Sequence, residues 1–492
     1  MIFDVAVIGA GAIGCALAYT LANYELKTCV IEKDSDVASG TSGRNSAVSH
    51  AGFNSRRGSL AAHYCVRGNR ALESLCKKLN VPFKKTGKLI VAMDESDIDG
   101  LRKLIADGEY NGVEGLLIIS AEESNRLAPG IKCVAAMFSE NTAIFDPFLY
   151  TVALAENAKI NGVEFFFESA VTNISKENDF FKIKAGIYDM NARCIINSAG
   201  LFSNEILKMA GGTYYPIYPC RGEYHVLDKS GKAKLDIPIY PVPRPGIGGL
   251  GVHLTPTTGG NIIIGPSAEY INDPEDYACT RETMDNLMYE AKILFPEIES
   301  RDIIRSYSGI RPKLVSAASG GFGDFIIRED EKVPGMINLI GIESPGLTSS
   351  MPIAEDVTKM ILQKFDKVKR KNKILTRSLE TPFNKLTDDE KHEKVKSNPL
   401  YGEIVCRCER ITKAEIVEAV ENPLGVRTLA GIKYRTRATM GRCQGGYCLT
   451  RIAEILISDY GMNPDEVTYR GKGSELLRGR TKIDQIQNPP EP

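Results

Sequence analysis

The chain has 492 residues, of which 43% are hydrophobic and 25% charged, with a formal net charge of −1. This length suits two or three domains with sizeable cores, and the balanced charge gives no electrostatic reason to expect a nucleic-acid partner. Residues 5–22 are uncharged and long enough to span a bilayer. Because Asp4 precedes them and no basic leader does, we expect neither a signal peptide nor a transmembrane segment. We therefore expect a cytoplasmic protein, compatible with peripheral membrane contact, whose twelve cysteines are mostly reduced.

The start of the chain predicts a dinucleotide-binding turn. An apolar run at 5–8 leads into Gly9, Gly11 and Gly14, and then into a helical pattern and a second apolar run that ends at Glu32. In such a turn the first glycine allows the tight bend, the second lets the backbone approach a pyrophosphate, and the third lets helix and strand pack closely. The helix N-terminus favours phosphate, and Glu32 is placed to accept hydrogen bonds from ribose hydroxyls.

The segments that follow do not continue as simple repeats of strand and helix. Residues 39–54 are rich in Gly, Ser and Asn and have no helical period, so we expect them to run along a ligand or a surface. Residues 192–206 predict a buried strand that ends in Ala199 and Gly200, followed by a helix. An enzyme that binds NAD would usually continue with further βα units.

Residues 337–362 show the same strand–turn–helix pattern as the start of the chain, with a strand, Gly341, a turn that contains Gly346, and a helix. Together these motifs resemble the D-amino-acid-oxidase-like family of FAD oxidoreductases over about residues 3–362. The resemblance implies FAD as cofactor. The cofactor-binding residues expected from the motifs and this resemblance are Gly9, Gly11, Ala12, Ile13, Gly14, Glu32, Lys33, Thr41, Ser42, Asn45, Ser46, Val171, Ala199, Gly200, Gly341, Ser344, Gly346, Leu347 and Thr348.

The family resemblance also implies a fold of the α/β and α+β classes, in which a Rossmann-like FAD-binding domain is interleaved with a mostly antiparallel substrate domain. The pattern agrees with this insertion: residues 145–174 predict a helix followed by strands, 220–228 and 260–270 predict strands, and a helix is expected to begin near Thr280. The expected FAD-binding segments are about 1–80, 145–215 and 325–365, and the substrate-domain segments are about 81–144 and 216–324.

Within the family, residues 42–54, 219–227, 240–269 and 307–314 look most like the FAD-dependent glycerol-3-phosphate dehydrogenases and the L-2-hydroxyglutarate dehydrogenases. Both groups oxidise a secondary alcohol beside an anionic group and pass a hydride to the flavin. The resemblance therefore implies a small anionic hydroxy substrate. The stretch 242–257 favours the second group somewhat.

Such a reaction needs a base for the hydroxyl proton and a cation for the anionic group. His50, one of only five histidines, lies in the segment expected along the cofactor, and imidazole titrates near working pH, so His50 is the candidate base. Arg311 is the candidate anion clamp, because a guanidinium binds phosphate or carboxylate at two points. His253 and Lys313 are secondary catalytic candidates.

After residue 365 the composition becomes lysine-rich, and residues 366–400 are expected to form a charged linker. Beyond it, Cys406 and Cys408 form one close pair and Cys443 and Cys448 another. Four thiolates can bind zinc or an iron–sulfur cluster, but zinc sites favour C-x-x-C pairs, and a disulfide is disfavoured in a reducing compartment.

This cysteine pattern resembles the bacterioferritin-associated-ferredoxin-like domain, which implies a 2Fe–2S cluster on Cys406, Cys408, Cys443 and Cys448. The expected domain is small and helical and covers residues 401–456, with a polar extension at 457–492. Zinc remains the alternative for the four thiolates. Nearby arginines would suit an anionic cluster, whose potential responds to cations and N–H donors.

The two halves together predict an FAD-dependent dehydrogenase that oxidises glycerol 3-phosphate to dihydroxyacetone phosphate. Its electrons would leave singly through the cluster to a flavoprotein or iron–sulfur partner. The alternatives are a dehydrogenase of L-2-hydroxyglutarate or another 2-hydroxy acid, then an amine or imino-acid dehydrogenase. A non-catalytic iron–sulfur electron carrier is a different class, and it would not need the long substrate domain.

Overall fold

The computed structural model describes residues 1–243 and 251–477. They form two compact units, the first made of residues 1–33 and 37–380 and the second of residues 34–36 and the chain from 381 onward. The expectations for the stretch 242–257 and for the C-terminal extension fall partly on residues 244–250 and 478–492, which lie outside the described residues. Each unit is described by itself below.

The first unit contains a mixed sheet of eight strands among the described residues, in the order β10-β11-β12-β1-β2-β9, with β20 pairing β12 and β19. Its strands are β1 (Ile2–Ile8), β2 (Thr28–Ile31), β9 (Glu164–Phe166), β10 (Val171–Glu177), β11 (Phe180–Ala185), β12 (Tyr188–Asn197), β19 (Ile326–Glu329) and β20 (Met336–Ile340). The strands β12, β1, β2 and β9 run parallel, as do β12 and β20.

Helices cover this sheet and meet one another. They are α1 (Ala12–Leu21), α2 (Leu60–Leu79), α5 (Pro147–Ile160), α6 (Ser203–Ala210) and α8 (Gly346–Leu362). α1 packs against α5 and α8, and α2 lies along α8. Because β1 and β2 are buried apolar runs and α1 is buried on most of its surface, the sheet and helices share a continuous core.

A second sheet of nine described strands lies at the other end of this unit and is antiparallel except where β14 pairs β5. Its strands are β5 (Lys88–Ala92), β6 (Leu116–Ser120), β7 (Ala135–Ser139), β13 (Tyr218–Leu227), β14 (Ile239–Pro241), β15 (His253–Pro256), β16 (Ile262–Gly265), β17 (Glu269–Tyr270) and β18 (Ile303–Lys313). Its helices are α3 (Ile98–Tyr110), α4 (Ala121–Leu127) and α7 (Arg281–Leu294). The expected fold class, a parallel core with an interleaved antiparallel sheet, is confirmed.

The first unit also contains a three-stranded sheet, β3-β8-β4. It consists of β3 (Val48–Ser49), β4 (Phe83–Lys84) and β8 (Ala143–Phe145). The expected helix near Thr280 is α7, for which Thr280 is the N-cap. Strand β3 ends immediately before His50, so this small sheet fixes where the candidate base lies.

The lysine-rich segment after residue 365 begins as an extended strap on the first unit. The backbone N–H of Leu375 donates to Asn161 Oδ1, and that of Arg377 donates to Asn157 Oδ1, so the strap is tied to α5. Residues 366–400 were expected to form a charged linker, but part of this segment is the helix α9 (Asp388–Ser397). Thr387 and Glu390 form a capping box there, and acids in the first turn and lysines in the last match the helix dipole.

The second unit is a small helical domain. It contains β21 (Ile404–Cys406), β22 (Ile411–Thr412), α10 (Lys413–Val420), α11 (Leu429–Thr436) and α12 (Cys448–Ser458). Its core combines aliphatic side chains of these elements with the buried sulfurs of Cys406 and Cys448. Val467, beyond the last helix, is also part of that core. The expected small helical C-terminal domain is therefore present.

Candidate functional site

The turn between β1 and α1 requires glycine at two of the predicted positions. Gly9 has φ +101°, and a Cβ on it would lie 2.6 Å from the carbonyl oxygen of Ser198. A Cβ on Gly14 would lie 1.9 Å from the carbonyl oxygen of Gly9. Ser42 Oγ accepts from the N–H of Ala12 at 2.9 Å. The backbone of this turn therefore packs closely against α1 and against Ser198, as the backbone of a dinucleotide-binding turn does.

Glu32 follows β2 and faces the same turn, because its Oε2 accepts from the N–H of Ala10 at 2.6 Å. This places a carboxylate beside the helix N-terminus, the position that suits a ribose hydroxyl. Ala199 also lies beside Gly9, since its Cα is 3.2 Å from where a Cβ on Gly9 would be. The residues around this turn therefore fit the adenine-nucleotide part of FAD.

Several other predicted cofactor residues lie away from the cavity described next. Lys33 forms an ion pair with Glu275 and lies over the ring of Phe202. Val171 begins β10. Gly341 has φ +69°, and a Cβ there would lie 2.3 Å from Leu314. Contact of Lys33, Val171, Gly200 and Gly341 with the cofactor stays a prediction.

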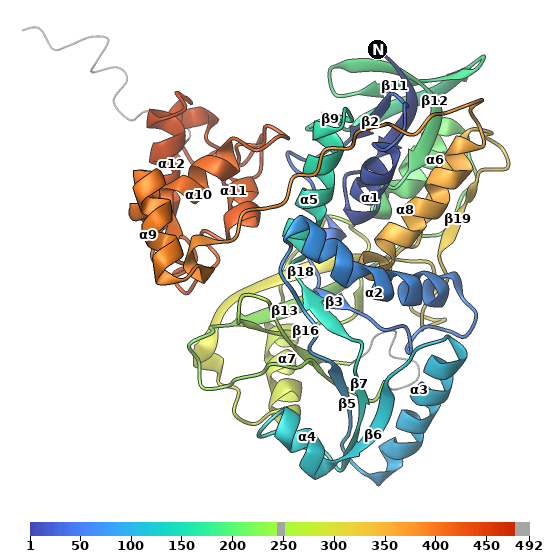
Figure 1. The fold of residues 1–492 in the computed structure, drawn as a ribbon. Coiled ribbons are helices and arrows are strands. Elements are labelled where there is room, and N and C mark those ends of the chain that lie inside the picture. Colours follow the sequence, from blue (N-terminus) through green and yellow to red (C-terminus); the bar gives the residue numbers. More distant parts are fainter. Residues whose placement is uncertain (244–250, 478–492) are drawn as a thin grey trace, which may run out of the picture. The chain divides into compact units, whose positions relative to one another are not determined.

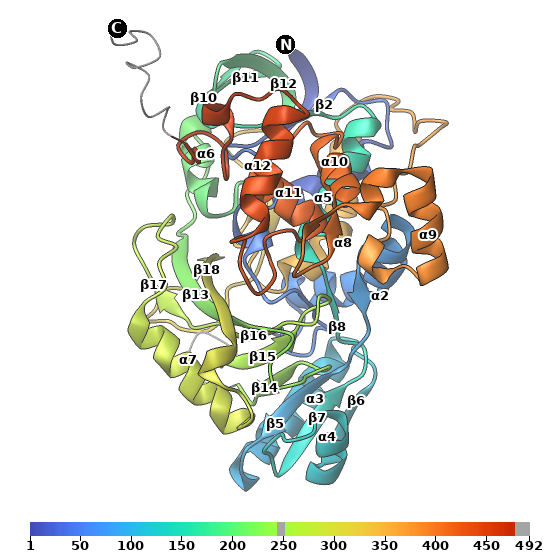
Figure 2. The same ribbon diagram turned by 90° about the vertical axis from the view of Figure 1, so that its left-hand side faces the viewer.

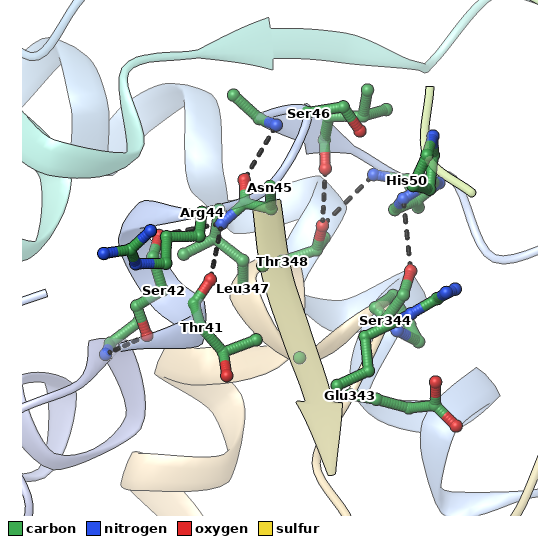
Figure 3. Close-up of a pocket in the computed structure, with 18 of the residues that line it drawn as sticks. Thr41, Ser42, Arg44, Asn45, Ser46, His50, Glu343, Ser344, Leu347 and Thr348 are labelled. Carbon is green, nitrogen blue, oxygen red and sulfur yellow. Dashed lines mark hydrogen bonds between the residues drawn. The ribbon is translucent and has the colours of Figure 1, made fainter. Parts of the chain in front are cut away.

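A cavity opens between the nine-stranded sheet, the start of α1 and the turn before α8, with about 1020 Å³ of empty space including the part open to solvent. Its walls come from residues 41–50, from β13, β14, β15 and β18, and from the turn before α8. We call it the first cavity (Figure 3). It brings together these predicted residues: Ala12, Ile13, Thr41, Ser42, Asn45, Ser46, His50, His253, Arg311, Ser344, Gly346, Leu347 and Thr348.

The segment 41–47 is held in place by its own backbone and by β18. Asn45 Nδ2 donates to the carbonyls of Thr41 and Ser42, and its Oδ1 accepts from the N–H of Ala47. A Cβ on Gly309 would lie 2.0 Å from the carbonyl oxygen of Arg44, so this loop packs directly on the strand. This polar segment is therefore a fixed part of the cavity wall, in agreement with the expectation that it runs along a ligand or a surface.

His50 lies where the cavity meets the turn before α8. Its Nε2 is 3.4 Å from Ser344 Oγ, and its backbone N–H donates to Thr348 Oγ1 at 3.1 Å. Burial, together with the charges of Lys88 and His253, holds the pKa of the His50 imidazole well below its ordinary value. His50 is thus neutral at pH 7, as a proton acceptor must be.

Buried polar atoms in the cavity wall that have no hydrogen-bond partner among the described residues include Arg311 Nε, His253 Nε2 and Glu343 Oε2. Arg311 Nη2 donates to the carbonyl of Ser267 at 2.9 Å, which holds the guanidinium in position. Because buried polar groups are almost always hydrogen-bonded, several such atoms around one cavity indicate a site for a polar ligand.

His253 and Lys313 differ in position. His253 is 3% exposed and its ring is stacked on that of Tyr240 at 3.7 Å between centroids, and burial lowers the pKa of His253 to about 3. Lys313 lies outside the wall, with Nζ 3.3 Å from Glu343 Oε1 and donating to the carbonyl of Gly321. The structure therefore makes Lys313 the counter-ion of Glu343 and does not place it in the cavity.

Sequence reasoning missed two ionisable groups at this site. Glu343 is 4% exposed and lines the first cavity, and burial raises the pKa of its carboxyl against the pull of Lys313 and Arg311. Lys88 is 1% exposed at the start of β5 and lines a neighbouring cavity. Both occur inside apolar or glycine-rich motifs, where a charged residue is rarely buried without a function.

The four cysteines of the second unit lie as two pairs. Cys408 Sγ and Cys443 Sγ are 3.5 Å apart, near the surface. Cys406 and Cys448 are buried, and a hydrogen bond from the Cys448 thiol lowers the pKa of Cys406 to about 6. The described residues contain no group of three or more side chains placed to hold a single metal ion. Pairs of this kind suit a cluster with two irons better than one tetrahedral zinc ion.

The backbone around these sulfurs also fits a cluster. The N–H groups of Glu409 and Thr439 donate to Cys406, and that of Tyr447 donates to Cys443. Thr439, a β-branched residue, has φ +69°, and its buried Oγ1 has no partner among the described residues. N–H donors to sulfur are the contacts that tune an iron–sulfur cluster, and strain of this kind gathers at functional sites.

Family models match both parts of the chain. The model described as FAD dependent oxidoreductase matches residues 4–360, and the model described as BFD-like 2Fe–2S binding domain matches residues 404–458. The expected FAD and 2Fe–2S cofactors are thereby confirmed. All twelve cysteines lie in the described part of the chain, and none of them forms a disulfide. Among the described residues, none of the helices has the length and apolar character needed to cross a membrane.

Individual proteins are similar over both parts or over the first alone. A glycerol 3-phosphate dehydrogenase of Caloramator mitchellensis is 37% identical over 98% of this chain and 99% of its own length. A mitochondrial L-2-hydroxyglutarate dehydrogenase of Arabidopsis thaliana is 32% identical over 73% of this chain and 83% of its own length. The structure of an L-alpha-glycerophosphate oxidase of Mycoplasma pneumoniae with FAD bound has 29% identity and a TM-score of 0.72, and covers 77% of this chain and all of its own.

Proposed function

This chain belongs to the family of FAD-dependent oxidoreductases and carries a BFD-like 2Fe–2S domain, and we propose that it oxidises glycerol 3-phosphate to dihydroxyacetone phosphate. The observation that carries the proposal is the first cavity, where a neutral imidazole, a guanidinium and a buried carboxylate face one space. The similarity to a glycerol 3-phosphate dehydrogenase, which extends over both domains, supports the same substrate.

Each ionisable side chain has a task in this reaction. His50 accepts the proton of the secondary hydroxyl, which its low pKa and its place beside Ser344 permit. Arg311 holds the anionic group, because its Nε is buried and free of protein partners among the described residues. FAD would supply the acceptor for the hydride of the carbinol carbon, so that the alcohol loses one proton and one hydride to become the ketone.

Glu343 favours glycerol 3-phosphate over L-2-hydroxyglutarate. On one side of the reacting carbon, the first substrate has a neutral CH2OH group and the second has a carboxylate. Glu343 Oε2 is buried and without a partner among the described residues, so it can accept a hydrogen bond from a hydroxyl. A second carboxylate at that place would be repelled in a low-dielectric cavity. L-2-Hydroxyglutarate remains the alternative, because its dehydrogenases are also similar in sequence.

The 2Fe–2S domain supports a dehydrogenase that passes electrons to another protein. The pair formed by Cys408 and Cys443 is the more exposed of the two, so a partner could approach the cluster from that side. We propose a flavoprotein or an iron–sulfur protein as that partner, because either takes up single electrons. Twelve cysteines that form no disulfide suit a reducing compartment such as the cytoplasm.

A substrate screen without oxygen tests the proposal. Glycerol 3-phosphate, L-2-hydroxyglutarate and a neutral amino acid are added separately to the FAD-loaded enzyme while its visible absorbance is followed. The proposal predicts that glycerol 3-phosphate bleaches the flavin at least tenfold faster than the other two. Faster bleaching by L-2-hydroxyglutarate would identify that compound as the substrate in place of glycerol 3-phosphate. No bleaching by any of the three compounds would favour a non-catalytic electron carrier.

A further inference from the structure

A second cavity adjoins the first and shares four wall residues with it, namely His50, Phe322, Ser344 and Pro345. The rest of its wall is residues 51–56, the start of α2, Lys88 and residues 323–324. The Arg56 side chain, 76% exposed, lies at its rim, whereas Lys88 is 1% exposed. The second cavity therefore extends from the protein surface to the candidate base.

Lys88 is a cation in apolar surroundings. Its Nζ lies 4.6 Å from the ring centre of Phe53 and 4.3 Å from that of Tyr240. Aromatic rings offset part of the charge, but among the described residues no carboxylate pairs with Lys88 or raises its pKa, and burial lowers that pKa to about 7. A buried ammonium without a counter-ion is strongly unfavourable, so its retention needs an explanation.

The other ionisable groups that face this space do not supply the missing negative charge. Asp324, the acid in the wall, accepts from the backbone N–H groups of Leu60 and Ala61 and lies 3.8 Å from Arg56. Burial keeps the pKa of His50 low and raises the pKa of the Cys65 thiol to about 12, so both are neutral at pH 7. The cavity is thus left with excess positive charge when Lys88 is protonated.

We propose that the second cavity is a binding site for a phosphoryl dianion, with Lys88 as its cation, and that the anionic substrate passes through it to reach His50. The identity of that substrate rests on the proposed function, but the anion site itself does not. Arg56 at the rim would attract the anion, and Lys88 would bind it by charge-assisted hydrogen bonds. Arg311 would then hold the anionic group once the substrate is in the first cavity.

Calorimetry with inorganic phosphate tests the anion site without any turnover. The FAD-loaded enzyme is compared with Lys88→Met, with Lys88→Gln as a second variant, and with Lys85→Met as a control on an exposed lysine of the same segment. The dissociation constant is expected to rise at least tenfold in both Lys88 variants and to change less than twofold in the control. Unchanged binding in the Lys88 variants, or no phosphate binding by the parent enzyme, overturns the proposal.

An Arg311→Met variant shows which cavity takes the free anion. The proposal expects it to retain phosphate binding, whereas loss of binding in Arg311→Met together with full binding in Lys88→Met would assign the anion to the first cavity and overturn the proposal. This comparison needs no substrate. It therefore stands even if glycerol 3-phosphate fails to bleach the flavin and the proposed function is wrong.

Steady-state kinetics separate the phosphate group of the substrate from free phosphate. With glycerol 3-phosphate, Lys88→Met is expected to lower kcat/KM at least tenfold and to leave kcat within twofold, because Lys88 acts on capture and not on hydride loss. An unchanged kcat/KM beside lost phosphate binding would mean that the site takes only the free ion, which refutes the substrate path. A fall in kcat alone would give Lys88 a part in the chemical step and also contradict the proposal.

Discussion

Replacement of Lys88 by methionine should make the folded protein more stable at neutral pH. Burial lowers the pKa of Lys88 from 10.5 to about 7, so between these values the unfolded chain binds more protons than the folded one. The contribution of this group to stability therefore rises with pH across that window. A residue kept only to stabilise the fold would have the opposite effect when removed.

The size of the effect follows from the two pKa values. Relative to a side chain that stays neutral, the titration of Lys88 costs the fold about 4 kcal/mol of stability at pH 7 and about 2 kcal/mol at pH 9, because protonation stabilises the unfolded chain more than the folded one. Lys88→Met removes this cost, because the thioether is apolar and of similar length. The difference in the free energy of unfolding between Lys88→Met and the parent should therefore be positive at pH 7 and shrink by about 2 kcal/mol at pH 9.

Thermal unfolding of the FAD-loaded proteins measures this difference. The parent, Lys88→Met and the exposed control Lys85→Met are compared at pH 7 and pH 9 in phosphate-free buffer, because a bound anion would itself stabilise the parent. Added phosphate should raise the Tm of the parent and not that of Lys88→Met. A variant less stable than the parent at pH 7, or an equal difference at both pH values, would refute the reasoning about a buried, unpaired ammonium.

Three further variants test the roles assigned to side chains in the two domains. His50→Gln should lower kcat by at least about 10²-fold with an unchanged FAD spectrum, and a wild-type rate would remove the candidate base. Glu343→Gln should lower the ratio of kcat/KM for glycerol 3-phosphate to kcat/KM for L-2-hydroxyglutarate at least tenfold, since it removes the charge that repels the second substrate. An unchanged ratio would show that Glu343 does not determine which substrate is preferred. Cys443→Ser should weaken or abolish the visible and EPR signals of the cluster while glycerol 3-phosphate still bleaches the flavin, and an intact cluster would exclude Cys443 as a ligand.

Much of the fold could be predicted because local patterns determine it. The glycine spacing at Gly9 and Gly14 predicts a turn whose crowding the structure confirms, since neither position has room for a Cβ. The N-cap of α7 falls at Thr280, where the helix was expected. The pairing of Cys406 with Cys448 and of Cys408 with Cys443 could not be predicted. Each pair joins residues separated by α10 and α11, and the pairing depends on how α12 packs on β21.

The site was predictable only where a residue lies inside a recognisable motif. His50 and Arg311 fall in such motifs, and the structure brings both to one cavity. Lys88 does not, and its burial depends on the pairing of β5 with β14, a strand about 150 residues later in the chain. Glu343 lies within the motif at residues 337–362, but only the three-dimensional structure shows that it is buried beside the cavity and that one of its oxygens lacks a partner among the described residues.

We propose that electrons from glycerol 3-phosphate enter at FAD in the first domain and leave through the 2Fe–2S cluster of the second. The most direct test is to add glycerol 3-phosphate to the purified enzyme without oxygen and record the visible absorbance and the low-temperature EPR spectrum of the same sample. Loss of the flavin absorbance together with the signal of a reduced 2Fe–2S cluster is the predicted result. Flavin bleaching with a cluster that stays oxidised, or a sample in which neither chromophore responds, would contradict the account.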